Sequence, residues 1–403
     1  QEELLVAADT KESIGVCMLT FSMPPEHSGA AKQAITLASK LAEKGVKIFF
    51  LTPRSTKFSR SINHVAGFRV VRVNKENVFW KALAPIRLFI ALFFERNNFS
   101  LIHVHGVGYL SNIAVLFGAI FRKKVIIKMT MFSEDDPVSI KKSRNGWINF
   151  FFFSKASKII SITNSFYDSC LSAKLPRSKL SLIPNGVDTD KYKAVSGEEK
   201  YALREKFNLP VNKTILVYAG IIRPEKGIDF LLDAMAYLGE SRQDIVLLLI
   251  GPVETWLSEN ERNFADKQVQ RILGDELKEL VYFVGKVDNV QEYFQSADLF
   301  ISASHREGFP NVLLEAMAIG LPPVVIDIPE VHVNILLDGV DGLVVKERIA
   351  KIFATSIERL VDDKGFYCAM STSAFNKVIS KFSVNNIAND YLILYKELTE
   401  NNR

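Results

Sequence analysis

Residues 297–320 place an apolar run, a glycine- and proline-containing loop and a helical run one after another, and this order most constrains the fold. Residues 297–303 have the apolar character of a buried strand, and residues 308–311 read Gly-Phe-Pro-Asn, a turn-forming sequence. Residues 312–318 then carry apolar side chains at helical spacing, and Gly320 marks the stop. A strand that runs through a short loop into a helix is the repeating unit of a parallel α/β sheet.

The same alternation opens the chain. Residues 13–21 predict a buried strand, residues 30–44 a helix that ends at Gly45, and residues 46–52 a second buried strand. The length of 403 residues suggests two to three domains. Further buried strands are expected at residues 101–105, 124–131, 159–163, 214–219, 245–250, 282–284 and 324–327.

Two glutamates bracket the loop and the helical run within residues 297–320. Glu307 follows the predicted strand, and Glu315 comes eight positions later. Open α/β sheets bind ligands beyond the carboxyl ends of their strands, and the backbone N–H groups of residues 309–312 should lie near a helix N-terminus that stabilises negative charge. The alternative for the glutamate pair alone is a solvated helix face.

A second glycine-containing loop carries cations. Gly220 ends a predicted strand, and Arg223 and Lys226 precede a helix predicted over residues 228–238. Paired cations at a helix mouth can meet a diphosphate and stabilise the charge of a departing phosphate group. The loop is not a P-loop, because the Lys-Ser/Thr ending is missing.

Charge divides the chain into a basic and an acidic part. Residues 1–190 hold 26 Lys and Arg against 14 Asp and Glu, whereas residues 191–403 hold 24 against 31. A basic first half fits an anionic lipid surface, an anionic glycan or nucleic acid, or has no charged partner at all. We exclude nucleic acid, because no nucleic-acid-binding module is recognisable.

Membrane-related and compartment signals are limited. Three widely spaced cysteines indicate a reduced cytosolic compartment, and no run reaches the roughly 18 apolar residues that span a bilayer. Residues 78–94 come nearest and predict either an interfacial helix or a core helix, of which we favour the core helix. Residues 141–158 mix basic and aromatic side chains, and we expect a helix with a buried aromatic face.

Polar residues of the first half offer weaker candidates. Asp135 and Asp136 lie in a loop after the strand of residues 124–131, where they either orient an acceptor hydroxyl or cap a turn. His103 and His105 alternate with Val104, and we expect at most one of them to face a cleft. His105 is the third candidate for contacting an acceptor, beside Asp135 and Asp136.

No metal or redox cofactor is expected. Asp188 and Asp190 spell an Asp-x-Asp, which we interpret as incidental because no further carboxylate lies near it in the sequence. The glycines after residue 105 do not complete a dinucleotide fingerprint, which argues against a nicotinamide cofactor.

Three strings together resemble one enzyme family. They are E-G-F-P-N-V-L-L-E-A-M-A at residues 307–318, I-P-N-G-V-D at residues 183–188, and Gly29-Ala30 before the first helix. They resemble the retaining glycosyltransferases of family 4, of the GT-B fold. The resemblance implies an α/β protein with two Rossmann-like domains, whose parallel sheets face each other across a cleft. It implies an N-terminal acceptor domain over residues 1–193, completed by a C-terminal helix over residues 382–403, and a nucleotide-sugar domain over residues 194–381.

The resemblance also implies roles for residues. Glu307 would position the donor sugar, and Lys226 with Arg223 would neutralise the diphosphate; these three form the catalytic set. Glu315 would hold the ribose. The donor-binding set implied is Gly29, Gly220, Gly308, Phe309, Pro310, Asn311, Val312 and Glu315.

Four positions depart from the family pattern. Met131 stands where many members have a sugar-contacting histidine, and Ile221 stands where an arginine follows the glycine. Ser28 and Glu330 each stand where a glycine is usual. We therefore assign no histidine role at residue 131.

The implied activity is metal-independent transfer of a sugar, with retention, from a nucleotide-sugar to a glycan or lipid-linked acceptor in cell-envelope polysaccharide synthesis. The resemblance implies a cytoplasmic protein at the inner face of the membrane, with peripheral membrane contact through its basic N-terminal domain. The alternatives are a nucleotide-sugar 2-epimerase, a glycan synthase or phosphorylase, and a catalytically silent binding scaffold on the same fold.

Overall fold

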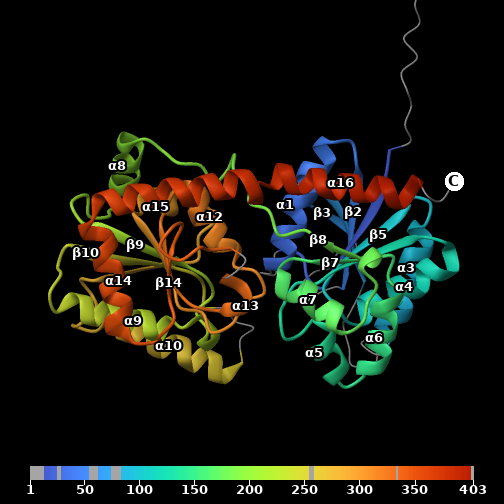
Figure 1. Ribbon diagram of the computed structural model, residues 1–403, viewed down its shortest axis with the longest axis horizontal. Helices are drawn as coiled ribbons and strands as arrows, with labels where there is room; N and C mark the ends of the chain where they lie inside the picture. Colours follow the sequence, from blue (N-terminus) through green and yellow to red (C-terminus); the bar gives the residue numbers. More distant parts are fainter. Residues whose placement is uncertain are drawn as a thin grey trace, which may run out of the picture. The chain divides into compact units, whose positions relative to one another are not determined.

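A computed structural model describes residues 13–24, 29–53, 62–73, 83–253, 258–332 and 335–400 of the chain (Figure 1). Contacts between Cα atoms divide the chain into two compact units. Unit 1 comprises residues 1–162, 166–183 and 387–403, and unit 2 comprises residues 163–165 and 184–386. The boundary predicted after residue 193 falls inside the second segment of unit 2.

The sheet of unit 1 has eight strands in the order β3-β4-β2-β1-β5-β6-β7-β8. All neighbouring pairs are parallel except β3 with β4. The order reverses between β1 and β5, which makes this pair the topological switch point of the sheet. The strands are β1 (Gly15–Thr20), β2 (Lys47–Pro53), β3 (Ile62–Val65), β4 (Phe68–Val73), β5 (Leu101–His105), β6 (Lys124–Lys128), β7 (Lys158–Ser161) and β8 (Leu180–Leu182).

Helices cover both faces of this sheet. On one face α1 (Gly29–Glu43) and α16 (Val384–Glu400) enclose an apolar core with the strands, and Tyr391 and Tyr395 of α16 are fully buried. The other helices of this unit include α3 (Ala84–Glu95), α4 (Tyr109–Phe121), α5 (Pro137–Lys142), α6 (Gly146–Lys155) and α7 (Asn164–Ser172).

Unit 2 has a six-stranded parallel sheet in the order β11-β10-β9-β12-β13-β14. Its switch point lies between β9 and β12, where the chain leaves one half of the sheet for the other. The strands are β9 (Thr214–Ala219), β10 (Ile245–Ile250), β11 (Val281–Gly285), β12 (Leu299–Ser302), β13 (Pro323–Ile326) and β14 (Leu343–Val345).

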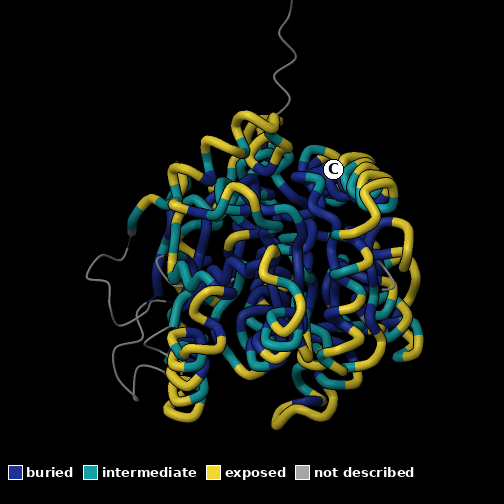
Figure 2. Tube along the Cα trace, turned by 90° about the vertical axis from the view of Figure 1, so that its left-hand side faces the viewer, coloured by how far each residue is buried: buried dark blue, intermediate teal, exposed yellow. Residues whose placement is uncertain are grey.

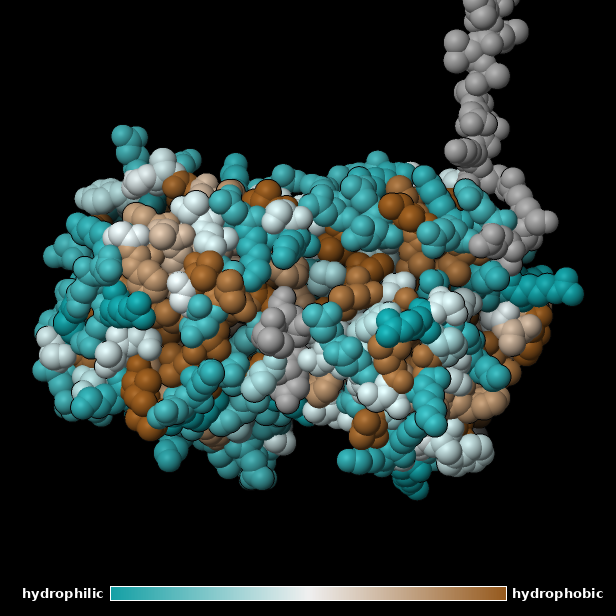
Figure 3. Space-filling model, viewed as in Figure 1, coloured by the Kyte–Doolittle hydropathy of each residue, from teal (hydrophilic) through white to brown (hydrophobic). Residues whose placement is uncertain are grey.

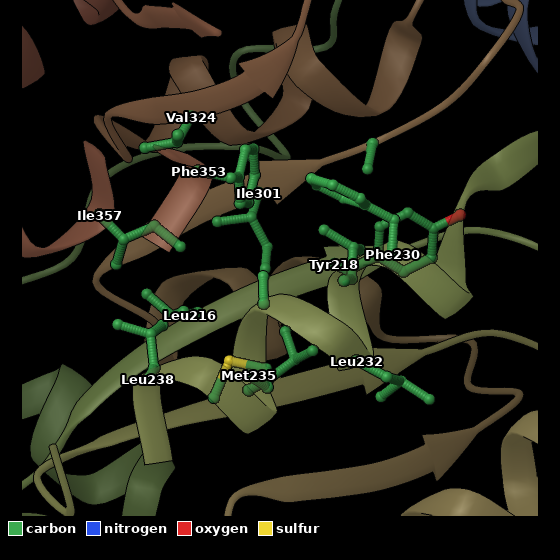
Figure 4. Close-up of a cluster of buried hydrophobic side chains, with 14 of the residues drawn as sticks. Leu216, Tyr218, Phe230, Leu232, Met235, Leu238, Ile301, Val324, Phe353 and Ile357 are labelled. Atoms are coloured by element: carbon green, nitrogen blue, oxygen red, sulfur yellow. The ribbon is translucent and has the colours of Figure 1, made fainter. Parts of the chain in front are cut away.

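The sheet of unit 2 packs between helices. In Figure 4, side chains of β9 and β12 meet those of α9 (Ile228–Gly239) and α14 (Ala350–Asp362) in one apolar cluster. Strand β10 is buried along its whole length, and Figure 2 shows such buried segments inside a shell of exposed ones. The remaining helices include α8 (Gly197–Lys206), α10 (Glu259–Leu273), α11 (Val290–Ser296), α12 (Asn311–Ile319), α13 (Pro329–His332) and α15 (Lys364–Lys377).

The predicted fold class is confirmed, because each unit has a sheet that is parallel, apart from the β3–β4 pair of unit 1, with helices on its faces. Helix α12 and strand β12 have nearly the predicted bounds, with the glycine at 320 in the left-handed conformation that ends the helix. The antiparallel hairpin of β3 and β4 was not predicted. It turns through Ala66 and Gly67, both at positive φ, as a two-residue hairpin loop requires.

Candidate functional site

The predicted site of unit 2 lies at its switch point. The loop of residues 220–227 follows β9, and the loop of residues 303–310 follows β12, so both leave the carboxyl edge of the sheet at neighbouring strands. The backbone N–H of His305 donates to the carbonyl of Glu225 over 2.8 Å, which joins the two loops directly. Ligands of open α/β sheets bind at such edges.

Glu307 and Lys226 meet between these loops. The Lys226 ammonium donates to Oε1 of Glu307 over 2.6 Å, and the Ser304 hydroxyl donates to the same oxygen over 2.7 Å. The side chains of Lys226 and Glu307 are 28% and 18% exposed, so the pair is partly shielded and still reachable from solvent. The two sequence-predicted residues of opposite charge are thus brought together, 81 positions apart in the chain.

Close packing fixes the loop that carries Lys226. Gly227 has φ +64°, and a Cβ at this position would lie 2.1 Å from the carbonyl oxygen of Ala303. Only a residue without a side chain fits that approach and that backbone conformation. Gly251 is required for the same reason, because a Cβ at this position would lie 1.7 Å from the carbonyl oxygen of Gly220.

Arg348 supports the loop after β12 and was not predicted. Its Nη2 donates to the carbonyls of Ala303 over 2.7 Å and Ser304 over 3.2 Å, and its guanidinium lies 5.2 Å from the Phe230 ring centre. Burial lowers the pKa of Arg348. No sequence signal marks it, because it lies more than forty positions beyond the loop that it holds.

Arg223 points to a different partner from Lys226. Its guanidinium pairs with Glu261 of α10 over 2.6 Å and with Glu225 over 3.2 Å. Hydrogen bonds from Ser258, and then from Arg223, lower the pKa of Glu261 to about 2. Arg223 therefore lies in the predicted loop, held by carboxylates other than Glu307.

Tyr218 lies beneath the pair. Burial, and then the negative charge of Glu307, raise the pKa of the Tyr218 hydroxyl well above its usual range. A Cβ at Gly220 would lie 2.5 Å from this hydroxyl, so the glycine leaves room for it. Tyr218 was not predicted as a site residue, because it belongs to a buried strand.

The first turn of α12 carries the predicted donor-binding run. A helix N-terminus offers backbone N–H groups without partners inside the helix and a positive dipole end, which suit an anionic group. The Asn185 amide donates to Oδ1 of Asn311 over 2.9 Å, and the Phe309 ring lies 6.2 Å from that of Phe382. Asn185 belongs to the I-P-N-G-V-D string, on which the family resemblance partly rests. Its contact with Asn311 was not predicted.

Glu315 occupies the fifth position of α12 and is 3% exposed. It shares this helix with Asn311 and lies one turn deeper into it. Its predicted contact with ribose stays a prediction, as do the roles of Gly308, Pro310 and Val312 around the helix start.

Unit 1 contains the remaining predicted residues. Gly29 begins α1, while Ser28 lies outside the described residues. The rings of His103 and His105 stack 4.3 Å apart, so both project from one face of β5. The expectation that at most one of them faces a cleft stays a prediction. Residues two apart on a strand share a face. His105 is 2% exposed, and its acceptor role stays a prediction.

Asp135 and Asp136 bond mainly to their own loop. Asp135 accepts from the backbone N–H groups of Thr130, Met131 and Val107 and from the Thr130 hydroxyl, at 2.7–3.1 Å. Burial nevertheless raises its pKa. Asp136 caps α5 by accepting from two backbone N–H groups of the first turn, the capping role that we considered beside an acceptor role.

Metal-ligating side chains do not cluster in the described part of the chain, where no group of three His, Cys, Asp or Glu could hold an ion. Asp188 of the Asp-x-Asp accepts from the backbone N–H groups of Asp190 and Lys191 over 3.1 and 3.2 Å, which is a turn interaction. Among the described helices, none is both long and apolar enough to cross a membrane.

Two family models match the chain, one in each half. "Glycosyltransferase Family 4" matches residues 27–191, and "Glycosyl transferases group 1" matches residues 199–377, so together they account for most of the chain. The second match contains both glutamates and both cations of the site.

Curated relatives and a solved structure resemble the chain over most of its length. The N-acetyl-alpha-D-glucosaminyl L-malate synthase of Bacillus anthracis is 24% identical over 388 residues, covering 94% of this chain and 96% of that protein. The UDP-Gal:alpha-D-GlcNAc-diphosphoundecaprenol alpha-1,3-galactosyltransferase of Escherichia coli is 23% identical, covering 72% and 73%. Matches to two further curated glycosyltransferases cover 60% and 58% of those proteins' lengths. Anabaena HepE, solved with UDP, has a TM-score of 0.77 at 17% identity, with 95% of this chain and 100% of that one covered.

Proposed function

Since the chain belongs to the group 1 glycosyl transferases and is a glycosyltransferase of the GT-B fold, we propose that it transfers a sugar from a nucleotide-sugar, with retention, to a glycan or lipid-linked acceptor. The observation that carries this proposal is the 2.6 Å contact between Lys226 and Glu307 at the switch point of unit 2. One loop supplies a cation for a diphosphate, and the next supplies a carboxylate for the sugar beside it.

The charges of the site suit diphosphate departure. As the bond between the sugar C1 and the diphosphate oxygen breaks, negative charge grows on the leaving oxygen. An ammonium already held in place stabilises that charge in the transition state more than in the ground state. We propose that Lys226, with Arg223 nearby in the same loop, takes this role without a metal ion, and that no other cofactor takes part.

The acceptor oxygen would attack C1 from the face that the diphosphate leaves. The new bond from acceptor oxygen to C1 forms as the old C1–oxygen bond breaks, and the acceptor proton passes to the leaving phosphate oxygen. This exchange retains the anomeric configuration and needs no protein nucleophile. Glu307, bonded to Lys226 and Ser304, would hold the sugar hydroxyls in the required orientation.

The relatives' names guide the choice of acceptor. The Escherichia coli relative is named for a diphosphoundecaprenol-linked acceptor and a UDP-sugar donor. Together with the basic first half of the chain, this supports a lipid-linked or cell-envelope glycan as acceptor. We propose that the protein works in the cytoplasm, at the inner face of the membrane.

A thermal-shift panel of nucleotide-sugars tests the donor half of the proposal. A ligand at a hundredfold over its dissociation constant stabilises the folded state by about 2.7 kcal/mol, so a cognate UDP-sugar should raise Tm by several degrees. The same sugar as a free monosaccharide should leave Tm unchanged. If no nucleotide-sugar or nucleoside diphosphate shifts Tm, the donor assignment is wrong.

Product analysis separates the activities. With a donor from the panel and a lipid-diphosphate sugar acceptor, NMR of the product should show the anomeric configuration of the donor. Inverted product would refute retention. Isomerisation of the donor at C2 without any acceptor would instead indicate an epimerase.

A further inference from the structure

Polar side chains from three neighbouring strands of unit 1 form a row at the carboxyl edge of its sheet. Thr20 ends β1, His105 ends β5 and Lys128 ends β6, and the strand register pairs Thr20 with His105 and His105 with Lys128. Residues paired in this way project to the same face of the sheet. The row therefore crosses the switch point between β1 and β5, the part of an open α/β sheet where ligands bind.

Helix α16 adds aromatic side chains to this row. The Lys128 ammonium lies 5.6 Å from the centre of the Tyr391 ring, and the centre of the His103 ring lies 5.2 Å from it. His103 stacks on His105 and shares a 2.7 Å hydrogen bond, through its Nδ1, with the Tyr395 hydroxyl. The set called here the buried polar cluster comprises Thr20, His103, His105, Lys128 and Tyr391.

The buried polar cluster is shut off from solvent, because each of its five residues is at most 3% exposed. Figure 3 shows hydrophilic residues spread over the visible surface of the molecule, which is where lysine side chains usually lie. A buried lysine loses the water that stabilises its charge, so it either finds a partner or releases its proton.

The cluster has more polar atoms than partners. Four of its buried atoms have no hydrogen-bond partner among the described residues, namely Oγ1 of Thr20, Nε2 of His103, Nε2 of His105 and the hydroxyl of Tyr391. Lys128 has no ion pair to any described residue either. Buried polar groups without partners are rare, and several of them together indicate a bound water or ion.

A buried cation of unit 2 shows the usual arrangement. Arg204 is 7% exposed, and its guanidinium pairs with Asp298 over 2.6 Å and donates to the carbonyl of Ser296 over 2.9 Å. A buried cation held in this way is compensated by charge and by hydrogen bonds. Lys128 has neither, which distinguishes it from Arg204.

The elements around Lys128 supply no carboxylate to it. Strands β1, β5 and β6 contain no Asp or Glu, and the acidic residues of α16 are exposed. The buried residues of α1, on the same face of the sheet, include no titratable side chain. The titratable groups that face Lys128 are therefore the imidazoles of His103 and His105 and the phenol of Tyr391.

We propose that the buried polar cluster binds a small monovalent anion beside Lys128, with the hydroxyls of Thr20 and Tyr391 as further donors. One ammonium compensates one negative charge. An anion only accepts hydrogen bonds, so it suits a set of N–H and O–H donors better than water, which also has to donate. Because the cluster is so deeply buried, a free ion that enters by local opening fits it better than a group attached to a large substrate.

Binding of the anion should take up a proton. Burial lowers the pKa of Lys128 to about 7 and holds the pKa values of His103 and His105 well below their usual range. Above pH 7 the folded chain without the anion therefore has an uncharged Lys128, and the anion binds together with a proton from solvent. The apparent affinity should fall by up to about tenfold for each pH unit above 7.

Thermal unfolding in chloride tests the inference, because the charge of chloride does not change with pH. Chloride should replace gluconate, a monovalent anion too large for the cluster, at constant ionic strength. At pH 7 the Tm should rise with chloride concentration and then saturate. At pH 9 the half-saturating concentration should be at least about tenfold higher. This comparison uses the unchanged chain and needs no variant to fold.

Substitutions locate the effect. Lys128→Met should abolish the saturable rise in Tm, and Tyr391→Phe, which removes one hydroxyl, should raise the half-saturating concentration about tenfold. The matched control is Lys123→Met, which removes the same charge from a half-buried lysine of unit 1. The Lys123 ammonium already donates to the carbonyl of Phe99 over 2.6 Å, so this variant should keep the full response to chloride.

The inference is independent of sugar transfer. Lys226→Ala, which removes a cation of the proposed donor site, should leave the chloride response unchanged, and Lys128→Met should leave the shift of Tm by nucleotide-sugar unchanged. An equal chloride response in Lys128→Met and in the unchanged chain would overturn the proposal. So would a Tm of the unchanged chain that does not depend on chloride at pH 7, which would assign water to the cluster.

Discussion

The two units share one architecture and use charge in different ways. At the switch point of unit 2, an acid and a base from separate loops are held together, Glu307 with Lys226. In unit 1, in the loop after β6, Asp135 accepts from backbone N–H groups and Asp136 caps α5, while Lys128 is buried without an ion pair to any described residue. The exposed charge of unit 1 instead includes basic side chains outside any such pair, at Arg122, Lys142 and Arg144.

This difference assigns the units different tasks. Paired, partly exposed charges at a sheet edge stay available to a polar ligand, because neither charge is fully neutralised by burial or by the backbone. Carboxylates that accept several backbone hydrogen bonds stabilise a loop and have little capacity left for a substrate. We therefore expect substitutions in unit 2 to change activity and those in unit 1 to change stability or membrane contact.

Replacing Glu307 with glutamine should have the largest effect. The amide keeps the size of the side chain and loses the charge that holds Lys226, so kcat should fall about 10²–10³-fold, as for loss of one transition-state contact. Steady-state kinetics with the cognate donor measures this. Glu276→Gln, an exposed change in the same unit, should leave kcat as it is. Full activity of Glu307→Gln would break the contrast between the units.

Separate substitutions of Arg223 and Lys226, in the loop of residues 220–227, distinguish their roles at the donor site. Lys226→Ala should lower kcat about a hundredfold, while Arg223→Ala should lower it about tenfold, because Arg223 is bonded to Glu261 and Glu225. The ratio of the two kcat values is the measurement. An Arg223→Ala effect equal to or larger than that of Lys226→Ala would mean that Arg223 leaves Glu261 during turnover.

The pH dependence of the free energy of unfolding tests whether Lys128 of unit 1 is buried without an ion pair. The lysine lies among His103, His105 and Tyr391, and burial lowers its pKa from the usual range to about 7. Between about pH 7 and 10 the unfolded chain therefore binds the lysine proton that the folded chain has released, so the free energy of unfolding rises with pH.

The comparison variant is Lys128→Met, which keeps the length of the side chain without the charge. From pH 7 to pH 9 the unchanged chain should gain about 2 kcal/mol relative to this variant. Urea unfolding at both pH values, followed by a probe in unit 1, measures the difference. Burial is the larger cause that lowers the pKa of His103 and His105, ahead of the Lys128 charge, so both rings are neutral above pH 7 in both proteins and their contributions nearly cancel. Equal pH dependence of the two proteins would show that Lys128 is paired in solution.

Asp136 separates capping from acceptor binding, and its expected effect is the smallest. Asp136→Ala should lower the free energy of unfolding by about 1 kcal/mol, whereas Asp136→Asn, which can still cap α5, should be near neutral. Neither change should alter kcat once the protein is folded. Loss of activity in Asp136→Asn with stability intact would establish an acceptor contact.

Local pattern predicted most elements, because buried strands and amphipathic helices show their periodicity in the chain. It predicted helix α12 from apolar spacing and a glycine stop, and it identified Glu307 and Lys226 from loops that follow strands. These two were found to meet only in the structure, since a contact between residues 226 and 307 depends on strand order.

Other features depended on packing that a sequence does not display. Arg348 supports the loop after β12 although it lies more than forty positions further along the chain, and no sequence feature near Arg348 indicates this role. We expected a core helix over residues 78–94, of which residues 78–82 lie outside the described residues, and a helix with a buried aromatic face over residues 141–158. Their apolar residues surround the whole helix, so the sequence did not distinguish the inward stripe from the outward one, and Trp147 and Phe151 are exposed.

The central claim is that Lys226 and Glu307 form the diphosphate and sugar end of a donor site. Calorimetric titration of a cognate nucleoside diphosphate into the unchanged chain and into Lys226→Ala tests it most directly. The account predicts a Kd at least about tenfold weaker for the variant, because one charge-assisted contact is lost. An unchanged Kd in a folded Lys226→Ala protein would contradict it.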